Sequence, residues 1–233
     1  QNTIMRVRYS GIPVAVAPHG LTLGGGCEMT MHSDVAVAAA ETYIGLVEVG
    51  AGLIPAGGGT KELALRASDK YFKGDIEIPT LQEMSLNIAM AKVATSAREA
   101  FDLGILRKGI DIEVMNSNRV IAEAKNAVLE LANNGYTPPQ QRSDIKVLGR
   151  SALGSFYTGI ASMRMGNYIS AHDEMIAKKV CYVICGGDLS APTEVNEQYL
   201  LDLEREAFLS LLGEKKTLER MQFILKTGKP LRN

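Results

Sequence analysis

Three consecutive glycines, at positions 24–26, separate a short apolar run from a segment that can form a helix. The apolar run at residues 14–17 lies between two prolines, and this pattern favours a buried strand over a helix. Residues 34–39 form a second apolar run of strand length. A strand, a glycine-rich turn, a helix over 25 to about 32 and another strand form an α/β unit. The sequence therefore predicts an α/β fold built around this turn.

Two carboxylates accompany the glycine-rich segments of the chain. Glu28 falls on the first turn of the predicted helix, and Glu48 lies between two valines in an irregular segment. Glycine lets a backbone N–H approach a ligand closely, and three in a row cost chain entropy unless that approach is used. Burial of Glu48 would favour its protonated, acid-competent form. The alternatives are that Glu28 is only a helix-start acid and Glu48 only an exposed loop acid.

Two nucleotide-binding motifs do not fit these glycines. A P-loop places Lys before Ser or Thr after its last glycine, whereas Thr60 here precedes Lys61. The glycines at 20 and 24–26 also lack the Gly-x-Gly-x-x-Gly spacing of a dinucleotide-binding turn. A third interpretation uses the free N–H groups at the helix start, with Gly25 as the best donor, to stabilise a developing oxyanion.

Composition excludes several classes of partner. The 233 residues contain 25 basic and 26 acidic side chains, a balance that argues against nucleic acid and anionic membranes as partners. Three cysteines are too few for a disulfide framework, and their spacing is not that of a zinc site. No apolar run approaches about 18 residues, and no signal-peptide pattern is present. We therefore expect a cytoplasmic protein with no metal and no membrane span.

The second half of the chain has the 3.6-residue periodicity of amphipathic helices. Apolar residues in 118–133 and in 196–212 each form one buried stripe. Further helices are predicted over residues 60–67, 80–93, 96–103, 150–165, 169–184 and 214–225. We expect a division into residues 1–110 and a mainly helical region at 111–233.

The motifs of residues 11–110 resemble those of the crotonase superfamily, and specifically the enoyl-CoA hydratases. A helix at 97–105 resembles the Ala-x-x-Ala-x-x-x-Gly-Leu helix of that family. The matching motifs are Ile12-Pro13-Val14, His19-Gly20-Leu21, Gly24-Gly25-Gly26-Cys27-Glu28, Ser33-Asp34-Val35, Gly45-x-x-Glu48 and Gly52-x-Ile54-Pro55-x-x-Gly58-Gly59-Thr60.

This resemblance implies a β-β-α spiral that binds an acyl-CoA thioester as substrate. It implies that the Gly25 N–H is an oxyanion donor and that Glu28 and Glu48 are the two catalytic acids. No cofactor is implied, and NAD would be needed only if a dehydrogenase domain were fused upstream. The remaining positions that the resemblance assigns to substrate binding are Gly24, Gly26, Leu46, Pro55 and Gly57.

The sequence departs from the family at its beginning. In the family the first oxyanion donor and much of the pocket for the CoA adenine lie in an Ala-Gly-containing segment further upstream, and no such segment occurs here. The chain starts at Gln1, and residues 197–201 and 228–233 are similar to the C-terminal part of bacterial fusions of a 3-hydroxyacyl-CoA dehydrogenase and a hydratase. We expect an incomplete crotonase core from a larger protein, with little hydratase activity by itself.

Two other functions remain open at this stage. An isomerase of the same fold would move the double bond with a single acid, and a non-catalytic module would assemble with other domains or with copies of itself. Lys178 and Lys179 could meet CoA phosphates. His19 and His32 flank the glycine-rich turn, and we expect both to make solvent or core contacts.

Overall fold

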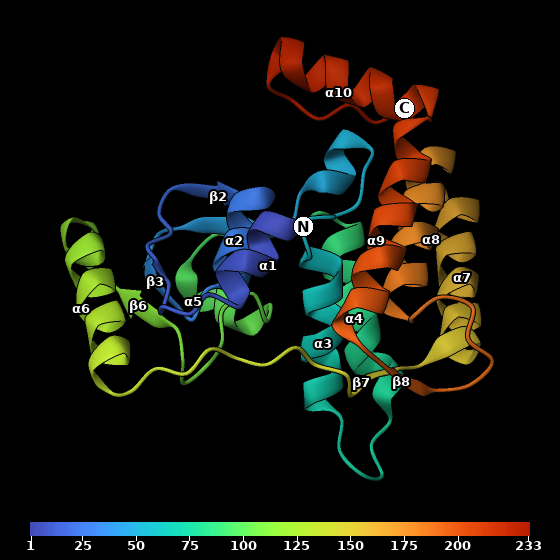
Figure 1. Cartoon of the computed structure of the whole chain (residues 1–233). Coiled ribbons are helices and arrows are strands. Elements are labelled where there is room, and N and C mark those ends of the chain that lie inside the picture. The colour runs from blue at the N-terminus through green and yellow to red at the C-terminus, as the bar shows by residue number, and fades with distance from the viewer. The chain divides into compact units, whose positions relative to one another are not determined.

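Two sets of interleaved segments make up the molecule in the computed structural model, which describes residues 1–233 (Figure 1). The first unit contains Gln1–Leu46, Gly57–Gly59 and Lys92–Gln141. The second unit contains Val47–Ala56, Thr60–Ala91 and Arg142–Asn233. The predicted division at residue 110 stays a prediction.

The first unit is built on two small sheets. One is parallel with the order β1-β3-β6, and in the other β2 pairs parallel and β5 pairs antiparallel with the central β4. The strands are β1 (Ala15–Val16), β2 (Leu21–Leu23), β3 (Val35–Ala39), β4 (Tyr43–Gly45), β5 (Val93–Ala94) and β6 (Ile112–Val114). The helices are α1 (Asn2–Arg8), α2 (Gly25–His32), α5 (Ala97–Asp102), η2 (Ser117–Arg119) and α6 (Val120–Asn133).

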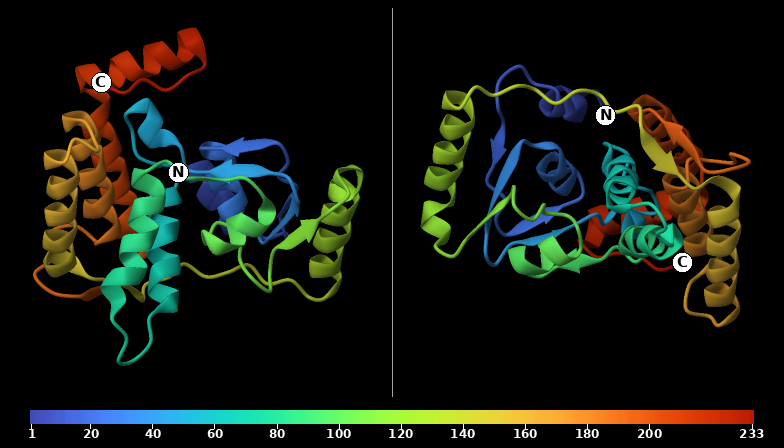
Figure 2. Two further views of the ribbon diagram at one scale, coloured as in Figure 1. Left: turned by 180° about the vertical axis from the view of Figure 1, so that it is seen from behind. Right: turned by 90° about the horizontal axis from the view of Figure 1, so that it is seen from below.

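Strand β3 is buried over its whole length and forms the core of this unit. Helix α6 packs against β3 (Figure 2). Val35 and Val37 pack against Ala124 of α6, and Leu131 extends the same helical stripe. A strand that is buried on both faces needs apolar side chains on both, which explains its uninterrupted Val/Ala sequence. The amphipathic pattern of α6 thus covers one face of the sheet.

The link from α2 to β3 is held by a polar cluster. Asp34 Oδ2 accepts a hydrogen bond from Val14 N at 2.7 Å, and its Oδ1 accepts one from the Tyr136 hydroxyl at 3.1 Å. Arg107 Nη2 donates to the carbonyls of Ser33 and Asp34, both at 3.0 Å. These bonds fix where α2 ends and β3 begins.

The second unit is mainly helical. Helix α8 packs against α4, α7 and α9 (Figure 2). Its N-terminus carries a Ser170–Asp173 capping box. Strands β7 (Ile145–Val147) and β8 (Thr193–Val195) pair antiparallel. The helices are η1 (Glu48–Ala51), α3 (Gly59–Lys70), α4 (Glu77–Ala89), α7 (Gly149–Met165), α8 (Ala171–Ile184), α9 (Glu197–Leu212) and α10 (Lys215–Thr227). None of these or of the other helices has the length and apolar character needed to cross a bilayer.

The structure corrects one predicted helix. The segment expected to be helical from 80 to 93 ends at Ala89, and Val93 instead pairs with Gly45 in β5. Ala91 adopts a left-handed conformation with φ of 49°, which an α-helix cannot continue through. The short helix α1 was not predicted, and Ile4 is its only buried residue.

Candidate active site

The glycine-rich turn leads directly into helix α2. Gly24 has φ of +57°, a conformation that strongly favours glycine, and its N–H donates to the Gly45 carbonyl at 3.0 Å. The carbonyl of Gly24 then accepts from Glu28 N at 2.9 Å and closes the first helical turn. The N–H of Gly25 belongs to the helix start, where backbone donors have no partner within the helix. The predicted role of the Gly25 N–H as an oxyanion donor stays a prediction.

Glu28 is held by a second glycine-rich segment rather than exposed on the helix surface. Its Oε1 accepts hydrogen bonds from Gly57 N at 2.8 Å and from Gly59 N at 2.9 Å, while only 5% of the residue is exposed. Burial raises the pKa of Glu28, and the two backbone N–H groups offset part of that rise. A buried carboxyl with a raised pKa is the form of acid that catalytic sites use.

The two segments approach each other closely at Gly57. A Cβ at Gly57 would lie 2.4 Å from Glu28 Oε2, which is well inside contact distance. Gly57 therefore touches the candidate acid itself. Its predicted role in binding substrate is not tested by this contact and stays a prediction.

His32 lies behind this arrangement as a core residue. The ring is fully buried, and its Nδ1 lies 2.7 Å from the Glu28 carbonyl oxygen. Gly58 has φ of +114°, and a Cβ there would lie 3.1 Å from the His32 ring. His32 thus packs under the loop that holds Glu28. The i,i+4 spacing of Glu28 and His32 on α2 is the sequence signal for this contact, and sequence reasoning missed it.

Glu48 begins the 3₁₀ turn η1 of the second unit and is half-buried. Its carbonyl accepts from Leu53 N at 3.1 Å, which closes the turn. Helix α10 holds the same turn, because Thr217 Oγ1 donates to the Gly52 carbonyl at 2.9 Å and Arg220 Nη1 donates to the Val49 carbonyl at 3.2 Å. The short turn predicted for Glu48 is confirmed.

The remaining candidate residues fall into both units. Leu46 is buried at the end of β4 in the first unit, together with Gly24, Gly25 and Gly26. Pro55 belongs to the second unit, where its carbonyl accepts from Thr60 Oγ1 at 2.9 Å. The two acids Glu28 and Glu48 belong to different units, so their convergence on one substrate stays a prediction.

The basic candidates for CoA phosphates lie on α8. Lys178 Nζ is 2.7 Å from Glu174 Oε1, and it also lies over the Tyr157 ring at 5.7 Å from the centroid. Lys178 is therefore already paired within its own unit. A role for Lys178 or Lys179 in phosphate binding stays a prediction.

Comparison with known proteins gives matches to one group of enzymes. Residues 1–73 match the family model described as "Enoyl-CoA hydratase/isomerase". The "Probable 3-hydroxyacyl-CoA dehydrogenase" of Bacillus subtilis (strain 168) is 45% identical over 233 residues, which is all of this chain and 29% of that protein. The "Short-chain-enoyl-CoA hydratase" of Clostridium acetobutylicum is 30% identical over 122 residues, or 50% of this chain and 42% of that protein. The chain thus spans less than half the length of either relative.

The fold is shared with solved enoyl-CoA hydratase structures. One such structure, from Mycobacterium avium subsp. paratuberculosis K-10, superposes with a TM-score of 0.56 at 14% identity and covers 99% of this chain and 69% of its own. At this level of identity the likeness shows the fold alone. The predicted α/β class, with a crotonase-type core and a helical C-terminal region, is confirmed.

Proposed function

Because the chain belongs to the crotonase superfamily of enoyl-CoA hydratases and isomerases, we propose that it forms the hydratase part of a fatty-acid oxidation enzyme. The proposed reaction adds water to a 2-enoyl-CoA. The observation that carries the proposal is the environment of Glu28, a buried carboxyl with a raised pKa on the helix that starts at Gly25.

The bonding of Glu28 distinguishes its two carboxyl oxygens. Both backbone donors reach Oε1, so a proton on this carboxyl resides on Oε2. A raised pKa makes the ionised form a stronger base and keeps the protonated form present closer to neutral pH. Glu28 can therefore exchange a proton with water or with a carbon of the substrate.

The Gly25 N–H supplies the complementary part of the mechanism. Addition of water to the β-carbon of an enoyl thioester places negative charge on the thioester oxygen. One preorganised N–H donor to such a charge contributes roughly 3–4 kcal/mol to stabilisation of the transition state. In hydration one of the two acids, Glu28 and Glu48, removes a proton from water and the other protonates the α-carbon.

The name of the matching family includes isomerases, and these form the first rival function. An isomerase shifts a proton between two carbons and needs one acid. A hydratase needs two. Glu28→Gln and Glu48→Gln in the full-length protein should each lower hydration of crotonyl-CoA by a factor of about 100 or more. Glu41→Gln, an exposed acid of the first unit, is the matched control and should leave the rate unchanged.

The outcomes of this experiment separate three functions. Loss of hydration in both glutamine variants supports the hydratase. Loss of hydration from only one variant, with isomerisation of a 3-enoyl-CoA lost in that same variant and retained in the other, supports the isomerase. Unchanged rates in both variants would support the second rival, a non-catalytic module that assembles with other domains or copies.

We also propose that the parent protein carries a 3-hydroxyacyl-CoA dehydrogenase activity outside this chain. The support is the name of the Bacillus subtilis relative, of which this chain covers 29%. Hydration of a 2-enoyl-CoA yields the 3-hydroxyacyl-CoA that such an enzyme oxidises, and NAD would serve only that step. The proposed partners are therefore acyl-CoA and the fused dehydrogenase, with a cytoplasmic location.

A further inference from the structure

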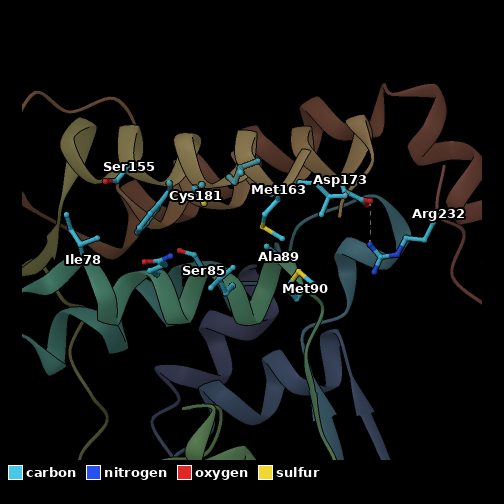
Figure 3. Close-up of a pocket in the computed structure, with 16 residues that line it drawn as sticks. Ile78, Ser85, Ala89, Met90, Ser155, Met163, Asp173, Cys181 and Arg232 are labelled. Carbon is cyan, nitrogen blue, oxygen red and sulfur yellow. Dashed lines mark hydrogen bonds and ion pairs between the residues drawn. The ribbon is translucent and has the colours of Figure 1, made fainter. Parts of the chain in front are cut away.

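A pocket of 330 Å³ lies within the second unit, away from any residue assigned above to catalysis or substrate binding. Helices α4, α7 and α8 form its walls, and the C-terminal segment contributes Arg232 (Figure 3). Its volume is within the range of about 300–1,000 Å³ that small-molecule sites occupy. The pocket therefore has the size to hold a ligand.

The body of the pocket is apolar. Phe156 and Ile160 of α7 and Ala177 of α8 are buried lining residues, while Met90, directly after α4, and Met163 of α7 supply flexible thioether side chains. Figure 3 shows the lining as an elongated row along α4, with Ile78 toward one end and Arg232 at the other. Methionine adapts its shape to varied apolar ligands. A linear aliphatic chain matches this shape and lining.

One end of the pocket carries an excess of positive charge. Asp173 Oδ1 pairs with Arg220 Nη1 at 2.8 Å, and both side chains are almost fully buried. Arg220 therefore already balances the negative charge of Asp173, and the positive charge of Arg232 is additional. Arg232 reaches Asp173 only at 3.5 Å, and its side chain is 63% exposed. Its planar guanidinium has five N–H donors, most of which remain available to an anion.

We propose that this pocket binds a linear aliphatic carboxylate, with the hydrocarbon chain between α4 and α7 and the carboxylate on Arg232. The apolar walls bind the chain, and the single charged end fixes its direction. Free fatty acid and the acyl chain of a larger anionic lipid share this chemistry. The site does not depend on the proposed hydratase activity, because none of its lining residues takes part in that proposal.

Two glycines of α7 allow a matched test of the pocket. Gly159 lines the pocket, Gly154 does not, and a Cβ at either position would meet no atom within 4 Å. Leucine at each position should therefore be accepted by the fold, and both changes improve helix propensity. Gly159→Leu places its side chain in the pocket, whereas Gly154→Leu is the control on the same helix.

Binding is measured by isothermal titration calorimetry with dodecanoate below its micellar concentration. The wild-type protein should show saturable binding with one site per chain. Gly159→Leu should weaken dodecanoate binding by about tenfold or more, because the added side chain occupies the space of the ligand. Gly154→Leu should bind dodecanoate as the wild-type does.

A second variant tests the charged end. Arg232→Gln should weaken dodecanoate binding by about threefold, as expected for an exposed ion pair, and should leave the binding of dodecanol unchanged. Added salt should reduce dodecanoate binding to the wild-type more than to Arg232→Gln. Repeating the titration with liposomes of phosphatidylcholine and phosphatidic acid distinguishes a membrane lipid from a free fatty acid as the ligand.

Several results would overturn the proposal. These are the absence of saturable dodecanoate binding, equal binding by Gly159→Leu and wild-type, and equal losses in the two leucine variants. Tighter binding of dodecanol than of dodecanoate would refute the role of Arg232. A change in oligomeric state caused by Gly159→Leu, without dodecanoate binding to the wild-type, would show that this face contacts another chain instead.

Discussion

At the scale of single residues, Glu28 combines a candidate catalytic role with a cost to stability. Its pKa is raised because it is buried, so the folded state binds a proton more tightly than the unfolded state does. Protonation of Glu28 therefore stabilises the folded state below the ordinary pKa of 4.5, and this stabilisation is lost as the pH rises through the pKa of Glu28 in the folded state. At neutral pH an ionised Glu28 therefore destabilises the fold.

Glu28→Gln should remove this penalty while abolishing the proposed proton transfer. The amide oxygen can still accept from Gly57 N and Gly59 N, so the loop should keep its position. We expect a higher melting temperature than wild-type at pH 7 and a smaller difference at pH 4, measured by circular dichroism. A lower melting temperature at pH 7 would contradict the assignment of a raised pKa.

Gly57→Ala tests the close approach that positions the same acid. The new Cβ would lie 2.4 Å from Glu28 Oε2, so either the loop or the carboxyl must move. Overpacking of this kind typically costs about 1–3 kcal/mol, which urea unfolding would detect. Gly25→Ala is the control, because its Cβ would meet nothing within 4 Å and its N–H is retained. Equal losses in both variants would show that the contact between Gly57 and Glu28 is not responsible.

At the scale of elements, turn η1 depends on helix α10 through Arg220. This side chain is 1% exposed, and its Nη1 is 2.8 Å from Asp173 Oδ1 and 3.2 Å from the Val49 carbonyl. Val49 follows Glu48 directly. Arg220, which lies 171 positions after Val49 in the sequence, therefore helps to fix the position of Glu48.

Arg220→Met should destabilise the second unit because it removes the buried partner of Asp173. Loss of one member of a buried ion pair costs about 3–5 kcal/mol. The double variant Arg220→Met, Asp173→Asn should recover part of this loss, since it also removes the buried charge. Unfolding in urea measures both changes, and an Arg220→Met variant as stable as wild-type would contradict this account of the pair.

At the scale of the whole molecule, the sequence was most informative where a local signal determines the structure. The start of α2 follows from the glycines before it, and the buried β3 follows from its apolar run. The predicted strand at 14–17 contains β1, whereas helix α1 and the other two- or three-residue strands have too few residues for a period to be visible. The backbone of Ala91 also ended a helix that apolar spacing alone would have continued.

The candidate site shows the same limit. The resemblance to hydratases pointed to Glu28, Glu48 and Gly25, but it gave no contacts between them and their surroundings. The bonds from Gly57 and Gly59 to Glu28 span 29 and 31 residues. No periodicity or short motif specifies a contact at that separation, because it depends on how β3 and β4 return the chain to α2. The partners of the acid could be found only in three dimensions.

A buried ion network shows how distant segments of the second unit depend on one another. Lys61 is fully buried on α3, and its Nζ lies 3.1 Å from Glu62 Oε2 and 3.0 Å from Glu197 Oε2 on α9. Its backbone N–H donates to Glu204 Oε2 at 3.0 Å. Arg142 N donates to Glu197 Oε1 at 2.9 Å, so the network also reaches the segment before β7. Helices α3 and α9 are therefore joined by buried charged and polar contacts.

Lys61→Met should keep the volume of the side chain and remove its charge. Glu197 would then be buried without its lysine, at a cost of about 3–5 kcal/mol in the free energy of unfolding. Lys178→Met is the matched control, because its pair with Glu174 is partly exposed and contributes less than about 1 kcal/mol. The double variant Lys61→Met, Glu197→Gln should restore much of the loss, since no uncompensated charge remains at that position. Urea unfolding with equal midpoints for Lys61→Met and Lys178→Met would show that this network does not stabilise the second unit.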